Sequence, residues 1–313
     1  MRPNHYFISI LFSISLSFGQ GLRELPKLDR NVPSSDSTQY DSDNKVRDYY
    51  HFRMEDDEML DVNVQYGFGE LNLKANQHDH RFDGSVLYLP SFVTPNITYQ
   101  TTAGEGSLFI GLPQKSGKTY PTAFHRWKSE IGNEFHNEAE FMLPPAIPLN
   151  LTVDFGLGEA EVDFSTLTIN YLDMNCGLGT MEVSMTRPNK TIAEYLTIDT
   201  GLGEFEGEGL GNFRAKRVSI DVGMGSAEID MRGKNLVDME IDISVGLGSM
   251  ELILPEKANI RIAADHNFLS SVTVHNLQKS RSGWVSDEWK EGLPTINVDA
   301  NVGMGSIEIR VRN

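Results

Sequence analysis

The sequence predicts an all-β fold, in which units of strand, glycine corner and strand stack into a parallel β-solenoid. Three observations predict it. A ten-residue pattern recurs along the 313 residues, apolar and polar residues alternate on both sides of its glycines, and long stretches with helical periodicity are absent. Glycine and β-branched residues are plentiful, which also favours strands and turns.

The repeated pattern contains Gly-apolar-Gly, then Ser, Thr or Glu, any residue, and Glu. Five adjacent copies are VDFGLGEAEV from Val153, MNCGLGTMEV from Met174, IDTGLGEFEG from Ile198, IDVGMGSAEI from Ile220 and ISVGLGSMEL from Ile243. Their first glycines are 21, 24, 22 and 23 residues apart. Further copies start at Val64 (VQYGFGELNL), at Thr102 (TAGEGSLFI, degenerate) and at Ala300 (ANVGMGSIEI). A period of this size indicates stacked repeats.

Each repeat is expected to bury one face. Around Gly223, apolar residues alternate as in a half-buried strand, and the phase changes at Gly225–Ser226. We expect a corner there, because glycine tolerates the backbone angles that a corner needs. The expected corner glycines are Gly156, Gly158, Gly177, Gly179, Gly201, Gly203, Gly223, Gly225, Gly246, Gly248, Gly303 and Gly305.

Stacking the repeats about 4.8 Å apart aligns equivalent residues into columns that form one core. One expected column is Phe155, Cys176, Thr200, Val222 and Val245, and another is Leu157, Leu178, Leu202, Met224 and Leu247. Met224, Met250 and Met304 are likewise expected to face the core.

Four segments are predicted. Residues 1–19 are typical of a signal peptide, with Arg2, an apolar stretch from Ile8 to Phe18, and small residues before Gln20. Residues 20–45 are polar and predict a disordered linker, with an edge strand as the alternative. Residues 46–148 predict an N-terminal β module, and 149–313 the repeat domain. Beyond the signal peptide no stretch is long and apolar enough to span a membrane, so the mature chain is expected to be exported, periplasmic or extracellular.

Composition excludes some functions. Acidic residues outnumber basic ones 44 to 27, for a net charge of −17, so nucleic acid is not an expected partner. The single cysteine, Cys176, cannot form an intramolecular disulfide and is expected to be a buried thiol.

The chain resembles the LiaF-like, or toast-rack, proteins of the bacterial cell envelope. The resemblance rests on residues 147–185 (IPLNLTVDFGLGEAEVDFSTLTINYLDMNCGLGTMEVSM), on DVNVQYGFGELNLK, and on ANIRIAADHNFLSSV followed by INVDANVGMGSIEIRV. It covers roughly residues 46–313 and implies a parallel β-solenoid at the envelope. The resemblance implies that some relatives regulate envelope stress signalling and carry transmembrane helices, whereas this chain is expected to have a cleavable signal and no transmembrane helix. The family implies no catalytic residues.

Catalytic and metal-binding motifs are not expected. The chain has no GxSxG, HExxH or GxxxxGK[ST] sequence. His78 and His80, with Asp79 between them, would share one face of a strand as metal ligands do, but no third ligand is identifiable and a solvated loop is the alternative. We therefore expect no cofactor and no catalytic site.

One glutamate recurs in the five adjacent copies and in the copy from Ala300, and stacking would bring these residues into a column. We name Glu182, Glu206, Glu228 and Glu251 the glutamate strip, a candidate binding site for a cation or a partner. The alternative is a solvated face that keeps the chain soluble. The segment with Trp284 and Trp289 is expected either to cap the last coil or to form a contact loop.

The sequence therefore favours a secreted, non-catalytic structural or interaction module whose partner is an envelope protein or polymer. Two alternatives stay open. One is a ligand- or cation-binding sensor in envelope stress signalling, and the other is a polysaccharide-active β-solenoid enzyme.

Overall fold

The computed structural model describes residues 39–40, 44–113 and 137–313. The predicted signal peptide lies outside the described residues, and so does most of the predicted linker. Gln39–Tyr40 form strand β1, which pairs antiparallel with β2 (Val46–Arg53), as the edge-strand alternative expects for those two residues. Among the described residues, no helix has the length and apolar character needed to cross a membrane.

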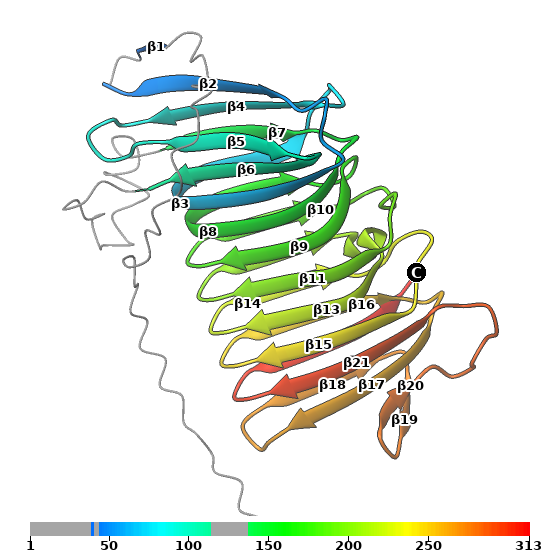
Figure 1. Ribbon diagram of the computed structural model, residues 1–313. Coiled ribbons are helices and arrows are strands. Elements are labelled where there is room, and N and C mark those ends of the chain that lie inside the picture. Colours follow the sequence, from blue (N-terminus) through cyan, green and yellow to red (C-terminus); the bar gives the residue numbers. More distant parts are fainter. Residues whose placement is uncertain (1–38, 41–43, 114–136) are drawn as a thin grey trace, which may run out of the picture. The chain divides into compact units, whose positions relative to one another are not determined.

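The repeats form two walls of parallel strands, which confirms the predicted solenoid (Figure 1). The first wall contains β9 (Thr168–Cys176), β11 (Ala193–Thr200), β13 (Ala215–Val222) and β15 (Met239–Val245). The second wall contains β10 (Thr180–Ser184), β12 (Glu204–Glu208), β14 (Ser226–Asp230) and β16 (Ser249–Pro255). Strand β8 (Pro148–Asp163) runs through both walls and pairs with β9 and then β10. The pairing register is the one that the repeat predicts.

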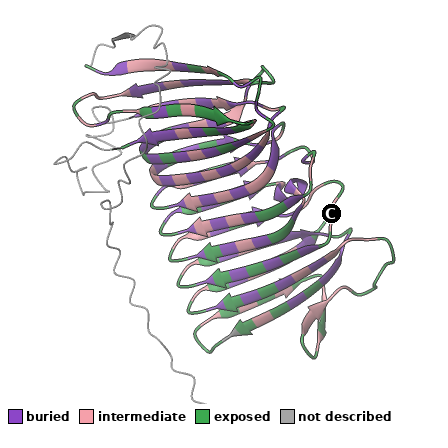
Figure 2. Cartoon of the chain, viewed as in Figure 1, coloured by how far each residue is buried: buried purple, intermediate pink, exposed green. Residues whose placement is uncertain are grey.

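Buried residues alternate with more exposed ones along the strands of both walls (Figure 2). The buried apolar residues of the two walls form one core. The first predicted column is confirmed, since Phe155, Cys176, Thr200, Val222 and Val245 are each only 2% exposed. The Cys176 thiol is buried as expected, and this burial raises its pKa to about 11 because the interior disfavours a thiolate.

Close approach between coils, rather than an unusual backbone angle, explains most of the corner glycines. A Cβ atom at Gly203, Gly225 or Gly248 would lie only 2.1–2.3 Å from the carbonyl oxygen of the equivalent glycine in the preceding coil. Of the twelve repeat glycines only Gly158 has a positive φ, of 133°. The expected corners exist, but a positive φ does not explain glycine at eleven of the twelve positions. At ten of these eleven, a Cβ would lie less than 3.0 Å from a backbone atom of the neighbouring coil.

The second predicted column does not lie in the core, since Leu157 is only half-buried and its other four members are exposed. Leu178, Leu202, Met224, Leu247 and Met304 occupy the middle of the Gly-x-Gly corners, where they are 43–56% exposed. We name these five residues the corner ridge. The prediction that Met224 and Met304 face the core was therefore wrong, whereas Met250, at 3% exposed, is buried as expected. The chain turns from one wall to the other at the corner, so the alternation of the strand does not continue through it.

The C-terminal coils do not stack in chain order. Strands β17 (Asn259–His266) and β18 (Ser271–His275) come first in the sequence, but β21 (Thr295–Val302) and β22 (Ser306–Arg312) lie between them and the preceding coil. Accordingly, β21 pairs with both β15 and β17, and β22 pairs with both β16 and β18.

A small hairpin covers part of the open edge of β17. Its strands are β19 (Gln278–Ser280) and β20 (Gly283–Val285), and β20 pairs antiparallel with β17. Trp284 packs against the core from this hairpin, while Trp289 is half exposed with the Arg261 guanidinium 4.4 Å from its ring centroid. The hairpin favours the capping role for Trp284 and leaves Trp289 in the loop that follows.

The N-terminal strands complete the other end. Strand β3 (Met59–Ala75) pairs in parallel with β8 and, on its other side, with β6 (Glu105–Leu112) and β7 (Glu138–Leu143). Antiparallel strands follow, β4 (Arg81–Tyr88) between β2 and β7, and β5 (Asn96–Thr102) beside β6. The repeat copy that starts at Val64 forms a corner within β3. The degenerate copy from Thr102 does not form such a corner, because Ala103 and Gly104 form the turn of the antiparallel β5–β6 hairpin. The boundary at 148/149 stays a prediction.

Buried asparagines stabilise the loops that return the chain between coils. The Asn189 side chain donates to the Ile169 carbonyl and accepts from its backbone N–H. Asn212, in the short 3-10 helix η2 (Leu210–Phe213), donates to the Met185 carbonyl in the same way (2.7 Å). These amides satisfy backbone groups that the loops would otherwise leave unpaired in the core.

Candidate functional site

The glutamate strip lies on the outer face of the second wall. Register pairs join Glu182 to Glu206, Glu206 to Glu228, and Glu228 to Glu251, so the four carboxylates stand side by side, one on each strand. The row continues at one end to Glu161 on β8 and at the other to Glu308 on β22. The structure thus assembles the column that the repeat predicts, but its function as a site remains a proposal.

Basic residues neutralise the C-terminal end of the row. Arg310 forms ion pairs with Glu308 (2.6 Å) and Glu251 (3.3 Å), and Arg312 reaches Glu251 (3.5 Å). The hydrogen bond from Arg310, joined by one from His275, lowers the pKa of Glu308. Glu251 is therefore less available to a partner than the other members of the strip. The sequence repeat gave no indication of these arginines, since other copies lack them.

The centre of the strip is not neutralised. Among the described residues, no basic side chain pairs with Glu182, Glu206 or Glu228, and all three are exposed. Neighbouring carboxylates about 4.8 Å apart repel by roughly 1 kcal/mol per pair in bulk water. A positively charged partner that lies along the wall would remove this repulsion.

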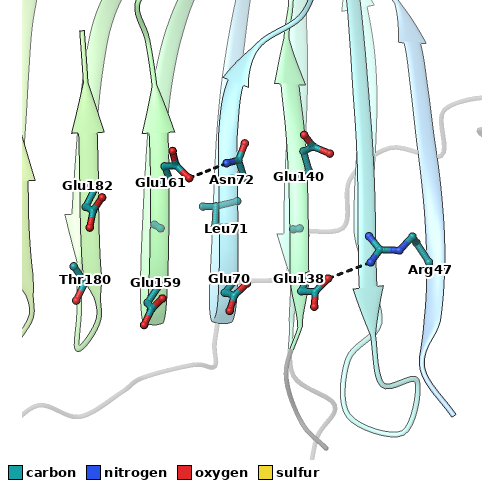
Figure 3. Close-up of a pocket in the computed structure, with 12 residues that line it drawn as sticks. Arg47, Glu70, Leu71, Asn72, Glu138, Glu140, Glu159, Glu161, Thr180 and Glu182 are labelled. Atoms are coloured by element: carbon teal, nitrogen blue, oxygen red, sulfur yellow. Dashed lines mark hydrogen bonds and ion pairs between the residues drawn. The ribbon is translucent and has the colours of Figure 1, made fainter. Parts of the chain in front are cut away.

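The acidic face widens at its N-terminal end into a depression of about 620 Å³. Figure 3 shows two rows of side chains there, on adjacent strands of β7, β3, β8 and β10. One row is Glu138, Glu70, Glu159 and Thr180, and the other is Glu140, Asn72, Glu161 and Glu182. Arg47 on β2 reaches Glu138 (3.1 Å), and Asn72 donates to Glu161 (3.3 Å).

The sequence prediction missed the contribution of β7 to this face. The motif that could have found it is Glu138-Ala139-Glu140, which repeats the Glu159-Ala160-Glu161 of β8. Residues 138–140 follow no Gly-x-Gly pair, so the repeat pattern excluded them, although β7 supplies the second wall at this position.

A preformed metal site is not found on this face. In the described residues, no three or more His, Cys, Asp or Glu side chains are grouped closely enough to hold a metal ion. His78, Asp79 and His80 lie in an exposed turn after β3, which is the solvated-loop alternative.

Two buried carboxylates elsewhere are structural in their contacts. Asp83 accepts hydrogen bonds from Asn76 (2.8 Å) and Arg81 (2.6 Å) and contacts His51 Nδ1 (2.5 Å). Burial alone would raise the pKa of Asp83, but these hydrogen bonds outweigh it and lower the pKa. Asp57 accepts from the Tyr99 and Thr101 hydroxyls. Both carboxylates are engaged by these partners.

The chain is similar to several solved structures of bacterial proteins. A candidate cell adhesion protein from Clostridium sporogenes has 17% identity and a TM-score of 0.46, covering 85% of this chain and 99% of its own. Candidate adhesins from Bacteroides fragilis (14% identity, TM-score 0.35) and Parabacteroides distasonis (13%, 0.32) each cover 84% of this chain and 96% of their own. At such low identities and TM-scores, these likenesses carry no conclusion about the function of this chain.

A family model matches the chain over more than half of its length. No curated protein matches the chain. The family model described as the N-terminal domain of toast_rack, DUF2154, matches residues 34–208, which is more than half of the chain. The match spans the N-terminal strands and the first three of the five adjacent repeat copies. The chain therefore belongs to the toast-rack family.

Proposed function

We propose that this chain is an exported, non-catalytic module of the bacterial cell envelope that binds a positively charged partner through its second wall. The signal-peptide features of residues 1–19 support export, and the resemblance to LiaF-like proteins supports the envelope. The observation that carries the proposal is the strip itself, with Glu182, Glu206 and Glu228 in register and exposed, and with none of the three in an ion pair in the described part of the chain.

The arrangement of the carboxylates supports binding over catalysis. A glycoside-cleaving site needs two carboxyl groups in different environments, one protonated and one ionised. The strip instead presents equivalent groups at a constant spacing on a solvated face. Such a row suits a partner whose positive charges also repeat.

The partner chemistry follows from the spacing. Calcium needs six to eight oxygen ligands at about 2.3–2.6 Å, whereas the strip offers one carboxylate per strand. A basic protein surface or an amine-bearing envelope polymer can contact several carboxylates at once without such close coordination. The binding is then multivalent, and salt weakens it.

The test uses tagged mature chain, residues 20–313, crosslinked in its own cell envelope. One sample carries Glu182→Gln, Glu206→Gln and Glu228→Gln, and a matched control carries Asp287→Asn, Glu288→Gln and Glu291→Gln, which removes the same charge from an exposed loop. We expect one partner with the wild type and the control, and its loss with the strip variant. Equal recovery of that partner by all three proteins would refute the strip as the binding face.

A further inference from the structure

The corner ridge is a continuous line of exposed apolar side chains. The backbone N–H of each ridge residue donates to the first corner glycine of the preceding coil, as Met224 does to Gly201 and Leu247 to Gly223 (both 2.8 Å). These bonds fix the register of the coils, so the five side chains follow one another at the coil spacing of about 4.8 Å.

Burial accounts for only part of the apolar character of the ridge, because about half of each ridge side chain stays exposed. The glycines on either side form the corner, and the residue between them contributes its backbone to the stack while its side chain remains 43–56% exposed. A serine or threonine also has the space to stand there and would favour solubility. Leucine or methionine nevertheless occupies all five corners, and contiguous exposed apolar surface of this kind marks an interaction site.

The ridge extends to the end of the stack. The turn between β17 and β18 lies on the last corner, where the Asn267 side chain donates to the Gly303 carbonyl (2.7 Å) and the Ser271 N–H to that of Gly305 (3.2 Å). This turn presents Phe268, 94% exposed, and Leu269, 54% exposed. Apolar side chains thus reach solvent at both kinds of turn, with and without the glycine pair.

Acidic and neutral polar residues border the ridge on both sides. In the coils from β8 to β16 and in β21–β22, the two outward positions nearest each corner on either wall hold only Asp, Glu, Asn, Ser or Thr. No Lys, Arg or His stands in any of these positions. Burial, together with the neighbouring Asp221 and Asp173, raises the pKa of Asp199 on the first-wall side of this border.

We propose that the corner ridge is the docking line for a cationic amphipathic helix. The proposal rests on the proposed function and deepens it by naming the partner's chemistry and the residues that receive it. A helix rises about 5.4 Å per turn, close to the coil spacing, so apolar residues at positions i, i+3 or i+4, and i+7 meet successive ridge residues. Lysines and arginines beside them face the acidic borders, including Glu206 and Glu228.

Charge favours a cationic helix over two other partners, a second copy of the chain and an anionic lipid surface. A second copy of the chain carries the same acidic borders, and at a net charge of −17 two ridges repel each other. An anionic lipid surface is repelled for the same reason. A helix with basic borders satisfies both the apolar line and its surroundings.

The test measures binding of an 18-residue helical peptide of leucine and lysine, with the leucines on one face. The mature chain is compared with a ridge variant, Leu202→Ser with Met224→Ser and Leu247→Ser. A control variant, Ile192→Ser with Trp289→Ser, removes apolar side chains that are equally exposed (46% and 50%) but lie off the ridge. We expect the ridge variant to bind about ten-fold more weakly, while the control stays within about two-fold of the wild type.

A scrambled peptide of the same composition separates ridge docking from simple charge attraction. Weaker binding of the scrambled peptide supports the proposal. Equal affinity for both peptides, or for the wild type and the ridge variant, overturns it. Two further results also overturn it: a dimer in sedimentation that only the ridge variant loses, or ridge-dependent binding to phosphatidylcholine vesicles without a preference for the helical peptide.

The ridge variant also separates this inference from the proposed function. It leaves Glu182, Glu206 and Glu228 intact, so it can enter the envelope crosslinking experiment beside the strip variant. Recovery of the partner by the ridge variant, with loss in the strip variant, would refute the docking line and leave the proposed function standing. Loss in neither variant would refute the proposed function.

Discussion

At the scale of single residues, the second glycine of each corner sets how closely two coils approach. A Cβ at Gly225 would lie 2.1 Å from the Gly203 carbonyl oxygen, far inside contact distance. The neighbouring coil cannot yield easily, because the obstructing atom is backbone that is itself hydrogen-bonded in the stack. Glycine is required at these corners because a side chain would collide with the backbone of the preceding coil.

Gly225→Ala should therefore destabilise the chain by about 1–3 kcal/mol, as overpacking in a close-packed interior does. Gly67→Ala is the matched control, because the nearest atom to its Cβ is the Leu112 carbonyl oxygen at 3.9 Å, and Gly67 belongs to the first corner of the stack. Denaturant unfolding of both variants measures the difference. Equal loss in the two would show that backbone freedom, and not space, explains the glycines.

The buried Cys176 gives a prediction in pH. Burial raises its pKa from 9.0 to about 11, so the folded state holds the thiol proton more tightly than the unfolded state does. Between pH 9 and 11 the thiol ionises in the unfolded state but not in the folded state, which favours unfolding. This contribution to stability is therefore complete below pH 9 and is lost as pH rises towards 11. Unfolding free energies of the wild type and Cys176→Ala should therefore converge across that range. A constant difference between them would show that the thiol does not titrate there.

At the scale of elements, the second wall carries a repulsion between carboxylates that contributes nothing to folding. The inward residues of β10, β12 and β14 bury the core, while their outward glutamates repel one another along the strip. The arginines of β22 relieve this repulsion only near the C-terminal coil, through Glu251 and Glu308. Because the repulsion remains at the centre of the second wall, this wall is suited to binding a positively charged partner.

Replacing Glu182, Glu206 and Glu228 by glutamine should raise the thermal midpoint, with a gain on the order of 1 kcal/mol at low ionic strength. Salt at 1 M should erase the difference, because it screens charges at this separation. The Asp287→Asn, Glu288→Gln and Glu291→Gln variant controls for the change in net charge. An unchanged midpoint of the strip variant at low salt would show that the wall carries no electrostatic cost.

At the scale of the whole described chain, strand β8 links the N-terminal strands to the repeats. It pairs with β3 over both walls and with β9 and β10 on its other side, so one core continues through it. A fragment of residues 149–313 would expose the backbone edge of β8 from which β3 has been removed. Unpaired strand edges of this length associate with other chains.

We expect the 149–313 fragment to self-associate, whereas a chain that begins at residue 39 should not do so through this edge. Sedimentation velocity at several concentrations measures the difference. A monodisperse, folded monomer of the fragment would show instead that the repeat coils form a unit independent of β3, in agreement with the predicted boundary at 148/149.

The sequence by itself determined the repeat, its register and the side chains that share a column. These follow from one constraint, because coils of nearly equal length that stack in parallel must align equivalent residues. For that reason the core column through Cys176 and Val222 and the row through Glu206 and Glu228 were both predictable from the spacing of the glycines.

Only the tertiary structure decided what faces solvent at the corners and which coils are neighbours. Alternation along a strand predicted Met224 in the core, but the chain changes direction at the corner and the side chain turns outward. The insertion of β21–β22 between β16 and β18 brings Arg310 to Glu251, a contact between residues of different repeats that no local pattern encodes. Local periodicity determines which side chains of a strand face the core, whereas the path of the chain between strands depends on how all the coils stack on one another.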